Sequence, residues 1–164
     1  MPSHSFYLQQ DEASRLKTIL DGTAAGTWEW NVQTGETIFN ERWAEIIGYS
    51  LEELQPISIE TWMKHAHPDD LALSEQKLNT HFRGDSEYYE CEARMRHRDG
   101  HWVWVRDYGR LVSRTLECEP EWISGTHIEI SSSKQYEQRL EQIKAEQQQT
   151  IQRFEKMASL LPGV

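Results

Sequence analysis

The sequence has few of the features that mark membrane, secreted or metal-binding chains. It contains no apolar run long enough to span a bilayer, and its N-terminus lacks the basic patch and apolar stretch of a signal peptide. Its two cysteines, Cys91 and Cys118, are not in CxxC spacing, which argues against a structural metal site and for a reducing compartment. We therefore expect a cytoplasmic protein that binds no metal and does not insert directly into a membrane.

The usual signatures of catalysis are also missing. Neither the phosphate-binding GxxxxGK(S/T) pattern nor the zinc-binding HExxH pattern occurs, and there is no GGDEF signature. No histidine follows His127, so the tail lacks a phospho-accepting histidine. We expect that this chain has no catalytic residues of its own, and that the catalytic domain of an enzymatic parent protein would lie beyond Val164.

Basic residues are too few to balance the acidic ones. The chain carries 17 Lys and Arg against 27 Asp and Glu, a net charge of -10. The tail from Ser131 to Val164 is slightly basic, so the acidic excess lies in residues 1–130. Because an acidic body repels phosphate groups, nucleic acids and anionic membrane surfaces are not expected partners.

The hydrophobic pattern predicts a mixture of short helices and strands. An amphipathic helix is predicted for residues 6–20, and a longer helix begins at His67-Pro68-Asp69-Asp70, with proline at its first position and acids in its first turn. Asp99-Gly100 is a strong hairpin signal. The predicted strands, in chain order, are 26–31, 36–39, 87–98, 101–112 and 121–130.

The tail from Ser131 has a different character from the rest of the chain. It is rich in Glu, Gln, Lys and Arg and contains neither Gly nor Pro until Pro162-Gly163. Its seam residues recur at alternating four- and three-residue steps, which predicts a coiled coil with a weak, polar centre; they are Tyr136, Leu140, Ile143, Gln147, Thr150, Phe154, Met157 and Leu161. Ile151 allows a second, shifted register.

Five segments, in this order and spacing, resemble a PAS domain with its PAC half, of the PAS fold-3 type. They are Gly26-Thr-Trp-Glu-Trp-Asn31, Trp43-Ala44 with Gly48-Tyr49-Ser50, His67-Pro-Asp-Asp70, Arg94-Met-Arg-His-Arg-Asp-Gly100 with Trp104-Val-Arg106, and Gly125-Thr126. The resemblance covers about residues 22–134. The sequence departs from the family at Glu129-Ile130-Ser131, where the family usually has Asp-Ile-Thr.

The resemblance implies an α+β fold in which short helices wrap a five-stranded antiparallel sheet around an internal pocket. It also implies a bacterial sensor that binds a small molecule and signals through flanking helices to an output domain, either a diguanylate cyclase or a histidine kinase. The expected organisation is a flanking helix over 1–21, the sensory domain over 22–130 and a signalling helix over 131–164. The alternative is a ligand-free module that only dimerises or interacts.

Strand alternation separates a predicted pocket wall from a solvent face. Residues 88–98 place Tyr89 and every second residue after it inward, whereas Glu90, Glu92, Arg94 and Arg96 would form a solvated ion-pair ladder. With residues from the helices and the other strands, the predicted pocket consists of Trp30, Trp43, Ile47, Met63, Leu78, Cys91, Ala93, Met95 and Ile128.

No bound cofactor is expected, but two alternatives stay open. A non-covalent flavin could stack on Trp28, Trp30, Trp102 and Trp104. Flavin-adduct photochemistry needs a reactive cysteine on a helix, and neither cysteine is predicted there. Haem would need His81 as an axial ligand. This single histidine near the end of a helix is the only feature of the sequence that favours haem.

We expect a homodimer and a polar signal relay. Trp102 and Trp104 lie on one face of a strand whose other face is also apolar, so that strand has to be covered on both sides. The expected dimer contacts are Leu16, Ile19, Trp102, Trp104, Leu140 and Ile143. The expected relay is Glu129, anchored to a basic side chain of the core or to backbone donors, together with Ser131, whose hydroxyl would cap the signalling helix, and Lys134.

Overall fold

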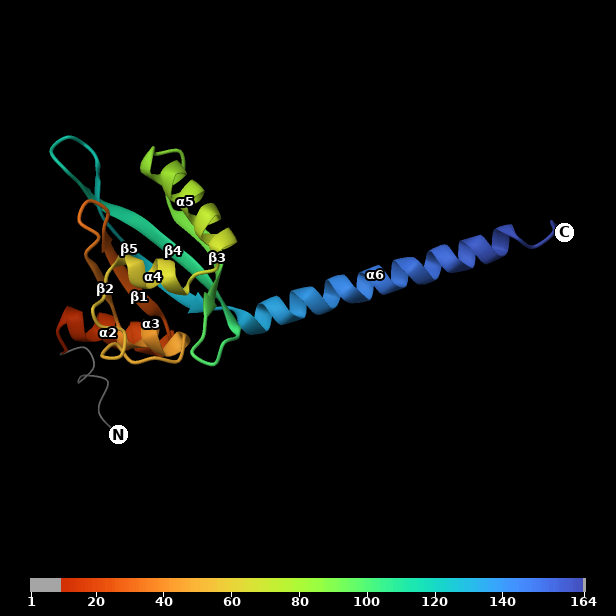
Figure 1. Ribbon diagram of the computed structural model, residues 1–164, viewed down its shortest axis with the longest axis horizontal. Helices are drawn as coiled ribbons and strands as arrows, with labels where there is room; N and C mark the ends of the chain where they lie inside the picture. Colours follow the sequence, from red (N-terminus) through yellow and green to blue (C-terminus); the bar gives the residue numbers. More distant parts are fainter. Residues whose placement is uncertain (1–9, 164) are drawn as a thin grey trace. The chain divides into compact units, whose positions relative to one another are not determined.

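The computed structural model describes residues 10–163 and contains one antiparallel sheet (Figure 1). Its strands are β1 (Gly26–Asn31), β2 (Thr37–Phe39), β3 (Tyr89–Arg96), β4 (Trp102–Arg114) and β5 (Pro120–Glu129). They pair antiparallel in the order β2-β1-β5-β4-β3. This confirms the predicted α+β class and the five-stranded sheet.

The chain divides into two compact units, one ending at Glu129 and the other beginning at Ile130. The first unit contains the sheet and four described helices, which are α2 (Glu12–Gly22), α3 (Glu41–Ile46), α4 (Ile59–His65) and α5 (Pro68–Phe82). The predicted N-terminal helix began at Phe6, which lies outside the described residues. The second unit contains α6 (Ser131–Ser159).

Side-chain caps explain where the short helices begin. Asn40 accepts a hydrogen bond from the Trp43 amide at the start of α3, and Ser58 forms a capping box with Thr61 at the start of α4. His67 accepts from the Asp69 amide, and proline occupies the first position of α5 as predicted. These caps fix the helices that pack on the inner face of the sheet.

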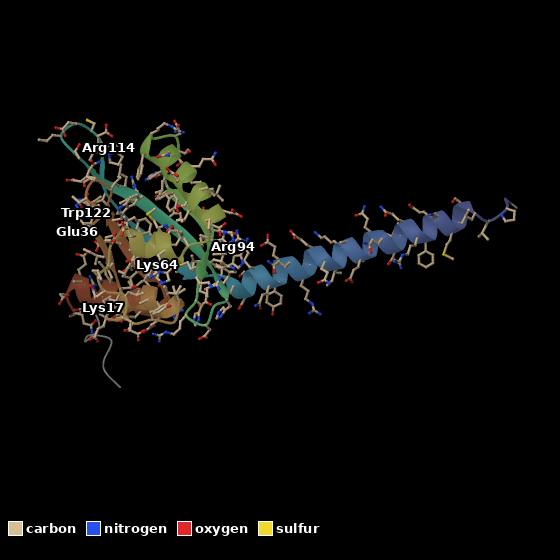
Figure 2. The ribbon with its side chains drawn as sticks, in the orientation of Figure 1. Lys17, Glu36, Lys64, Arg94, Arg114 and Trp122 are labelled. Atoms are coloured by element: carbon tan, nitrogen blue, oxygen red, sulfur yellow. The ribbon has the colours of Figure 1, made fainter. Side chains whose placement is uncertain are left out.

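The two faces of β3 differ in burial. Tyr89 and each second residue to Met95 are buried. On the opposite face, the Arg94 guanidinium (Figure 2) lies 5.2 Å from the Trp104 ring, and that of Arg96 lies 5.2 Å from the Trp102 ring. Part of the outer apolar surface is therefore covered by arginines of the neighbouring strand.

The α6 unit is a single helix of 29 residues with no buried side chain. Its apolar seam residues, including Leu140, Ile143 and Phe154, are exposed. Ile130 is the capping residue, and no side chain makes a capping hydrogen bond. The expectation that the Ser131 hydroxyl caps this helix is therefore wrong, because the helix already includes Ser131. None of the described helices is long and apolar enough to cross a membrane.

Candidate ligand-binding cavity

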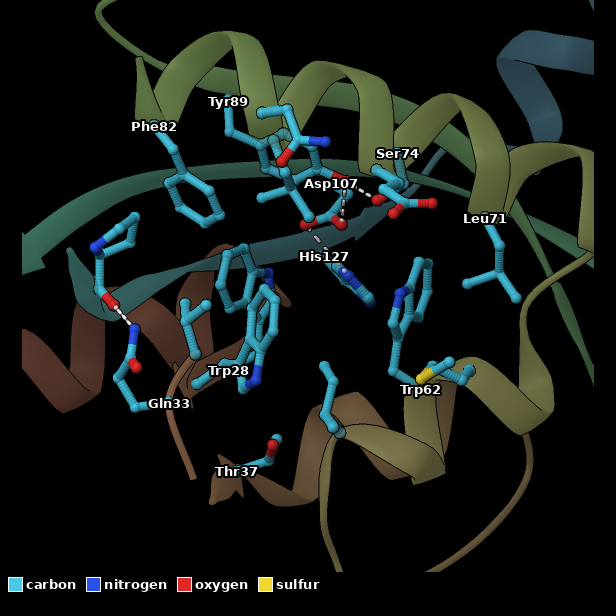
Figure 3. A pocket seen from close by; sticks show the side chains of 18 of the residues that line it. Trp28, Gln33, Thr37, Trp62, Leu71, Ser74, Phe82, Tyr89, Asp107 and His127 are labelled. Atoms are coloured by element: carbon cyan, nitrogen blue, oxygen red, sulfur yellow. Dashed lines mark hydrogen bonds and ion pairs between the residues drawn. The ribbon is translucent and has the colours of Figure 1, made fainter. Parts of the chain in front are cut away.

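A cavity of about 750 Å³ lies between the inner face of the sheet and helices α4 and α5. Figure 3 shows Trp28, Trp62, Leu71 and Phe82 around this space, with a cluster of polar side chains on one side. Most of the wall is apolar; these residues are Trp28, Trp30, Val32, Phe39, Trp43, Ile59, Trp62, Met63, Leu71, Ala72, Leu78, Phe82 and Pro120. The volume and the mostly apolar lining fall within the range found for small-molecule pockets in proteins.

Trp28 packs directly on two opposed glycines of the sheet. Gly109 of β4 faces Gly125 of β5, and Trp28 of β1 is in turn the partner of Gly125. A Cβ atom at Gly109 would lie 2.6 Å from the Trp28 ring, and one at Gly125 would lie 2.7 Å from it. Glycine at both positions lets the indole lie directly on the backbone, where it forms one wall of the cavity.

Aromatic rings surround the imidazole of His127. The ring centroids of Trp62, Trp43 and Trp28 lie 5.1, 5.8 and 6.4 Å from that of His127, whose exposed fraction is 3%. Trp43 is itself held by a parallel stack on Phe39, with centroids 3.6 Å apart. The imidazole is thus fixed in an aromatic enclosure at the wall of the cavity.

A buried polar network connects α5 to the sheet. Ser74 Oγ lies 2.7 Å from Tyr89 Oη, which donates a hydrogen bond of 2.9 Å to Asp107 Oδ2. His127 Nε2 lies 3.2 Å from Asp107 Oδ1. Burial, followed by the charge of Asp107, raises the pKa of Tyr89 far above its usual value, so its hydroxyl stays protonated and acts as a donor.

Several polar atoms of the cavity wall have no hydrogen-bond partner among residues 10–163. They are Asp107 Oδ1, His127 Nδ1 and the indole nitrogens of Trp28, Trp30 and Trp43. The contact between His127 and Asp107 is close enough for an ion pair but lacks hydrogen-bond geometry. An unpaired buried polar group costs about 1–3 kcal/mol, so this concentration of them calls for an explanation.

The rim of the cavity is tied by side-chain bonds to backbone carbonyls. Gln33 Nε2 donates to the Pro120 carbonyl at 2.7 Å, connecting the β1–β2 turn to β5. Arg114, at the end of β4, donates to the carbonyls of Phe82 and Cys118. These bonds add side-chain links between the β1–β2 turn, the end of α5 and the β4–β5 hairpin.

The predicted pocket residues fall into three groups. Trp30, Trp43, Met63 and Leu78 line the cavity. Four others are fully buried in the core but are not part of the cavity wall, namely Ile47, Cys91, Ala93 and Met95. Ile128 is half-buried, whereas its neighbour His127 lines the cavity.

The expectation for Ile128 is therefore off by one residue. The inward positions of β5 are Ile123, Gly125 and His127, and a shift of one residue moves a side chain to the other face. Apolar residues occur on both faces of this strand, so its pattern did not fix the phase. Asp107 was also missed, although it lies two residues beyond Val105 in the inward phase of β4.

The described residues do not support the two cofactor alternatives. His81 is buried, and both its ring nitrogens are engaged, Nδ1 with the Ser86 carbonyl and Nε2 as acceptor from the Leu111 amide, each at 2.9 Å. Neither nitrogen is free to ligate haem iron, and His81 does not line the cavity. The proposed flavin stack is also not assembled, because Trp28 and Trp30 line the cavity whereas Trp102 and Trp104 do not.

One group of metal-ligand side chains lies at the β3–β4 turn. The ligand atoms of His97, Asp99 and His101 lie within 4.8 Å of one another. His97 Nδ1 already accepts a hydrogen bond of 3.1 Å from the Asp99 amide, and the other two side chains are exposed. Turn structure is a sufficient reason for this arrangement.

The predicted relay and dimer residues are distributed over both units. In the first unit, Glu129 lies 3.6 Å from the Arg42 guanidinium, and Leu16 and Ile19 are exposed on α2. Trp102 is exposed and Trp104 is half-buried. On α6, Lys134 pairs with Glu137 at 3.4 Å, and Leu140 and Ile143 are exposed.

Comparisons with known proteins agree on one family. The sequence pattern of the PAS fold family matches residues 36–127. A sensory box histidine kinase/response regulator from Burkholderia thailandensis is 27% identical, with a TM-score of 0.72 over 82% of this chain and 98% of that one. The N-terminal domain of a diguanylate cyclase with a PAS/PAC sensor from Marinobacter aquaeolei is 28% identical, with a TM-score of 0.56 over 66% and 97% of the two chains.

A PAS domain from Colwellia psychrerythraea shares the fold at 20% identity, with a TM-score of 0.58 over 74% of this chain and 99% of that one. A search of curated proteins finds no match.

Proposed function

This chain belongs to the PAS fold family, and we propose that it is a sensory module whose cavity binds a small molecule. The observation that carries the proposal is the cavity of about 750 Å³, walled by aromatic rings and containing buried polar atoms without partners. A ligand that fills the space and pairs those atoms would remove the cost of leaving them unsatisfied.

We further propose that the signal passes to an output domain linked through α6, a histidine kinase or a diguanylate cyclase. The support is that two of the similar structures come from a sensory box histidine kinase/response regulator and from a diguanylate cyclase with a PAS/PAC sensor. The pairing of Glu129 with Arg42 would anchor the end of β5 to α3, as expected for a relay. In this proposal the chain itself senses and does not catalyse.

A ligand-free dimerisation module is the second candidate. It is favoured by the exposed apolar residues of α6 and by Leu16 and Ile19 on α2. The two candidates differ in a single property, which is whether the cavity takes up a molecule. Dimerisation is compatible with both.

Equilibrium dialysis of the purified chain against a small-molecule extract tests the proposal. We expect the wild type to enrich at least one compound, detected by mass spectrometry. Leu78→Trp enlarges a half-buried side chain of α5 that lines the cavity and should abolish the enrichment, whereas Ala13→Trp, on the exposed surface of α2, should not.

Two results would contradict a sensory cavity. One is the absence of any compound enriched by the wild type. The other is equal enrichment by a folded Leu78→Trp variant, which would place the binding outside the cavity. Either result would favour the ligand-free module.

A further inference from the structure

The proposed ligand site contains one buried carboxylate without a balancing cation. Asp107 is 4% exposed and lines the cavity, and Oδ2 accepts the hydrogen bond from Tyr89. Oδ1 has no hydrogen-bond donor in the part of the chain that the structure describes. A buried carboxylate is costly unless it is paired and hydrogen-bonded, so the donors available to Oδ1 decide what the cavity needs.

His127 does not satisfy the free oxygen of Asp107. Its Nε2 lies 3.2 Å from Asp107 Oδ1 without hydrogen-bond geometry, and its Nδ1 has no partner among the described residues. Asp107 Oδ1 is therefore left for a donor that a ligand brings into the cavity.

The other charged residues of the lining add to the negative potential of Asp107. Glu75 and Glu119 line the rim, and Arg83 is the single Lys or Arg of the lining within residues 10–163. Arg83 is exposed and already pairs with Asp85 at 3.1 Å. An anionic ligand would face Asp107 without a basic partner inside the cavity, and a neutral ligand would leave its charge unbalanced.

The tryptophan rings of the wall can also stabilise a positive charge. Indole faces are the best aromatic partners for ammonium groups, at about 6 Å or less from the ring centroid. Trp28, Trp43 and Trp62 all line the cavity beside His127. Asp107 Oδ1 is an acceptor in need of a donor, which an ammonium group supplies.

From this combination we propose that the cavity takes a small organic cation, a protonated amine carried on an apolar or aromatic body. The inference rests on the proposed sensory function and specifies the class of its ligand. The ammonium group belongs beside Asp107, and the apolar body belongs against the tryptophan and phenylalanine side chains. The acidic excess of residues 1–130 would also attract such a cation from solution.

Three probes of the same shape and different charge test the ligand class: phenethylamine as the cation, 2-phenylethanol as the neutral form and 3-phenylpropionate as the anion. Their dissociation constants for the full chain are measured by calorimetry at pH 7. We expect phenethylamine to bind about tenfold or more tightly than either of the others, equivalent to ~1.4 kcal/mol.

Asp107→Asn removes the charge while keeping the shape and should abolish this preference. Glu90→Gln removes the same charge from the outward-facing, exposed position next to Tyr89 and should keep the preference. Circular dichroism establishes that each variant is folded. If Asp107→Asn does not fold, the three probes on the wild-type chain decide the question alone.

The cation proposal is overturned if the alcohol or the acid binds as tightly as the amine, if none of the three binds, or if folded Asp107→Asn keeps the preference. These results test the class of ligand and not the sensory function itself. Tight binding of the alcohol or the acid, or enrichment of a non-cationic compound in the dialysis, would leave the cavity a ligand site of another class.

Discussion

At the scale of single residues, the cavity depends on positions where a side chain is absent. Gly109 and Gly125 form opposed positions of β4 and β5, and Trp28 lies over both. At Gly125 an added Cβ atom would also lie 1.9 Å from the Tyr108 carbonyl oxygen, which belongs to the backbone and cannot rotate away. The sheet can close here only around glycine.

We predict that Gly125→Ala destabilises the first unit strongly, by about 2–4 kcal/mol, because backbone and indole must both move. Urea unfolding followed by tryptophan fluorescence measures the free energy of unfolding. The control is Gly22→Ala, where no heavy atom lies within 4 Å of an added Cβ. Stability of Gly125→Ala within the error of the wild type would show that Trp28 is not held by this glycine pair.

The sequence alone did not predict that Asp107 and His127 meet at the cavity wall. The phase of β3 followed from its alternation, and four of the nine residues expected in the pocket line the cavity. Asp107 lies on β4 and His127 lies on β5. They are distant in the sequence and become Cα partners only when these two strands pair. A single buried acid or histidine gives no periodic signal, so their association required the sheet register.

At the scale of elements, an ion pair joins the start of α5 to β3. Arg94 donates to Asp70 Oδ2 from its backbone amide at 2.7 Å and from Nε at 2.8 Å, and to Oδ1 from Nη2 at 3.0 Å. The sequence predicted the helix start but placed Arg94 in a solvated ladder with Glu90 and Glu92. Arg94 instead binds back to Asp70, and Arg106 of β4 lies 3.6 Å from each of the two glutamates.

The ion pair between Asp70 and Arg94 makes the free energy of unfolding depend on pH in the acid range. Burial alone would raise the pKa of Asp70, but the hydrogen bonds from Arg94 outweigh it, and the pKa lies below its ordinary value. A carboxylate with a depressed pKa in the folded state stabilises the fold above its unfolded value of about 3.9. That contribution is lost as the pH falls through the lower, folded value.

We therefore predict that Asp70→Asn lowers the free energy of unfolding at pH 7 by about 2–3 kcal/mol and flattens its decline below about pH 4. Urea unfolding at a series of pH values measures both effects. Asp69→Asn, at the neighbouring and 82% exposed side chain, is the control and should change neither. An unchanged acid dependence in Asp70→Asn would remove this pair as its source.

At the scale of the whole molecule, the order of the elements and the resemblance to the PAS family together predicted the fold. Two strands, short helices and three further strands determined the class, and glycine, proline and capping residues marked most boundaries. The cavity wall was less predictable because its residues come from several strands and helices. A residue such as Cys91 can be buried in the core without facing the cavity. The burial pattern of one strand does not distinguish a core position from a position that lines the cavity.

Self-association is the whole-molecule property that the exposed seam of α6 predicts. We expect sedimentation velocity to show a concentration-dependent monomer–dimer equilibrium, because the seam is apolar at its ends and polar at its centre. Leu140→Glu should weaken the dimer about tenfold or more, equivalent to ~1.4 kcal/mol. Gln138→Glu, which adds the same charge outside the seam, should not. A strict monomer at high concentration, or equal effects of both variants, would contradict a dimer through α6.

The central claim is that the cavity holds a small molecule, and the tryptophan side chains test it most directly. Indole N–H resonances are measured by ¹H–¹⁵N NMR while the compound enriched in the dialysis is added to the chain. We predict shifts for Trp28, Trp30, Trp43 and Trp62, which line the cavity, and none for Trp102, Trp104 and Trp122, which do not. Unmoved resonances of the lining tryptophans, or shifts confined to the other three, would contradict the claim.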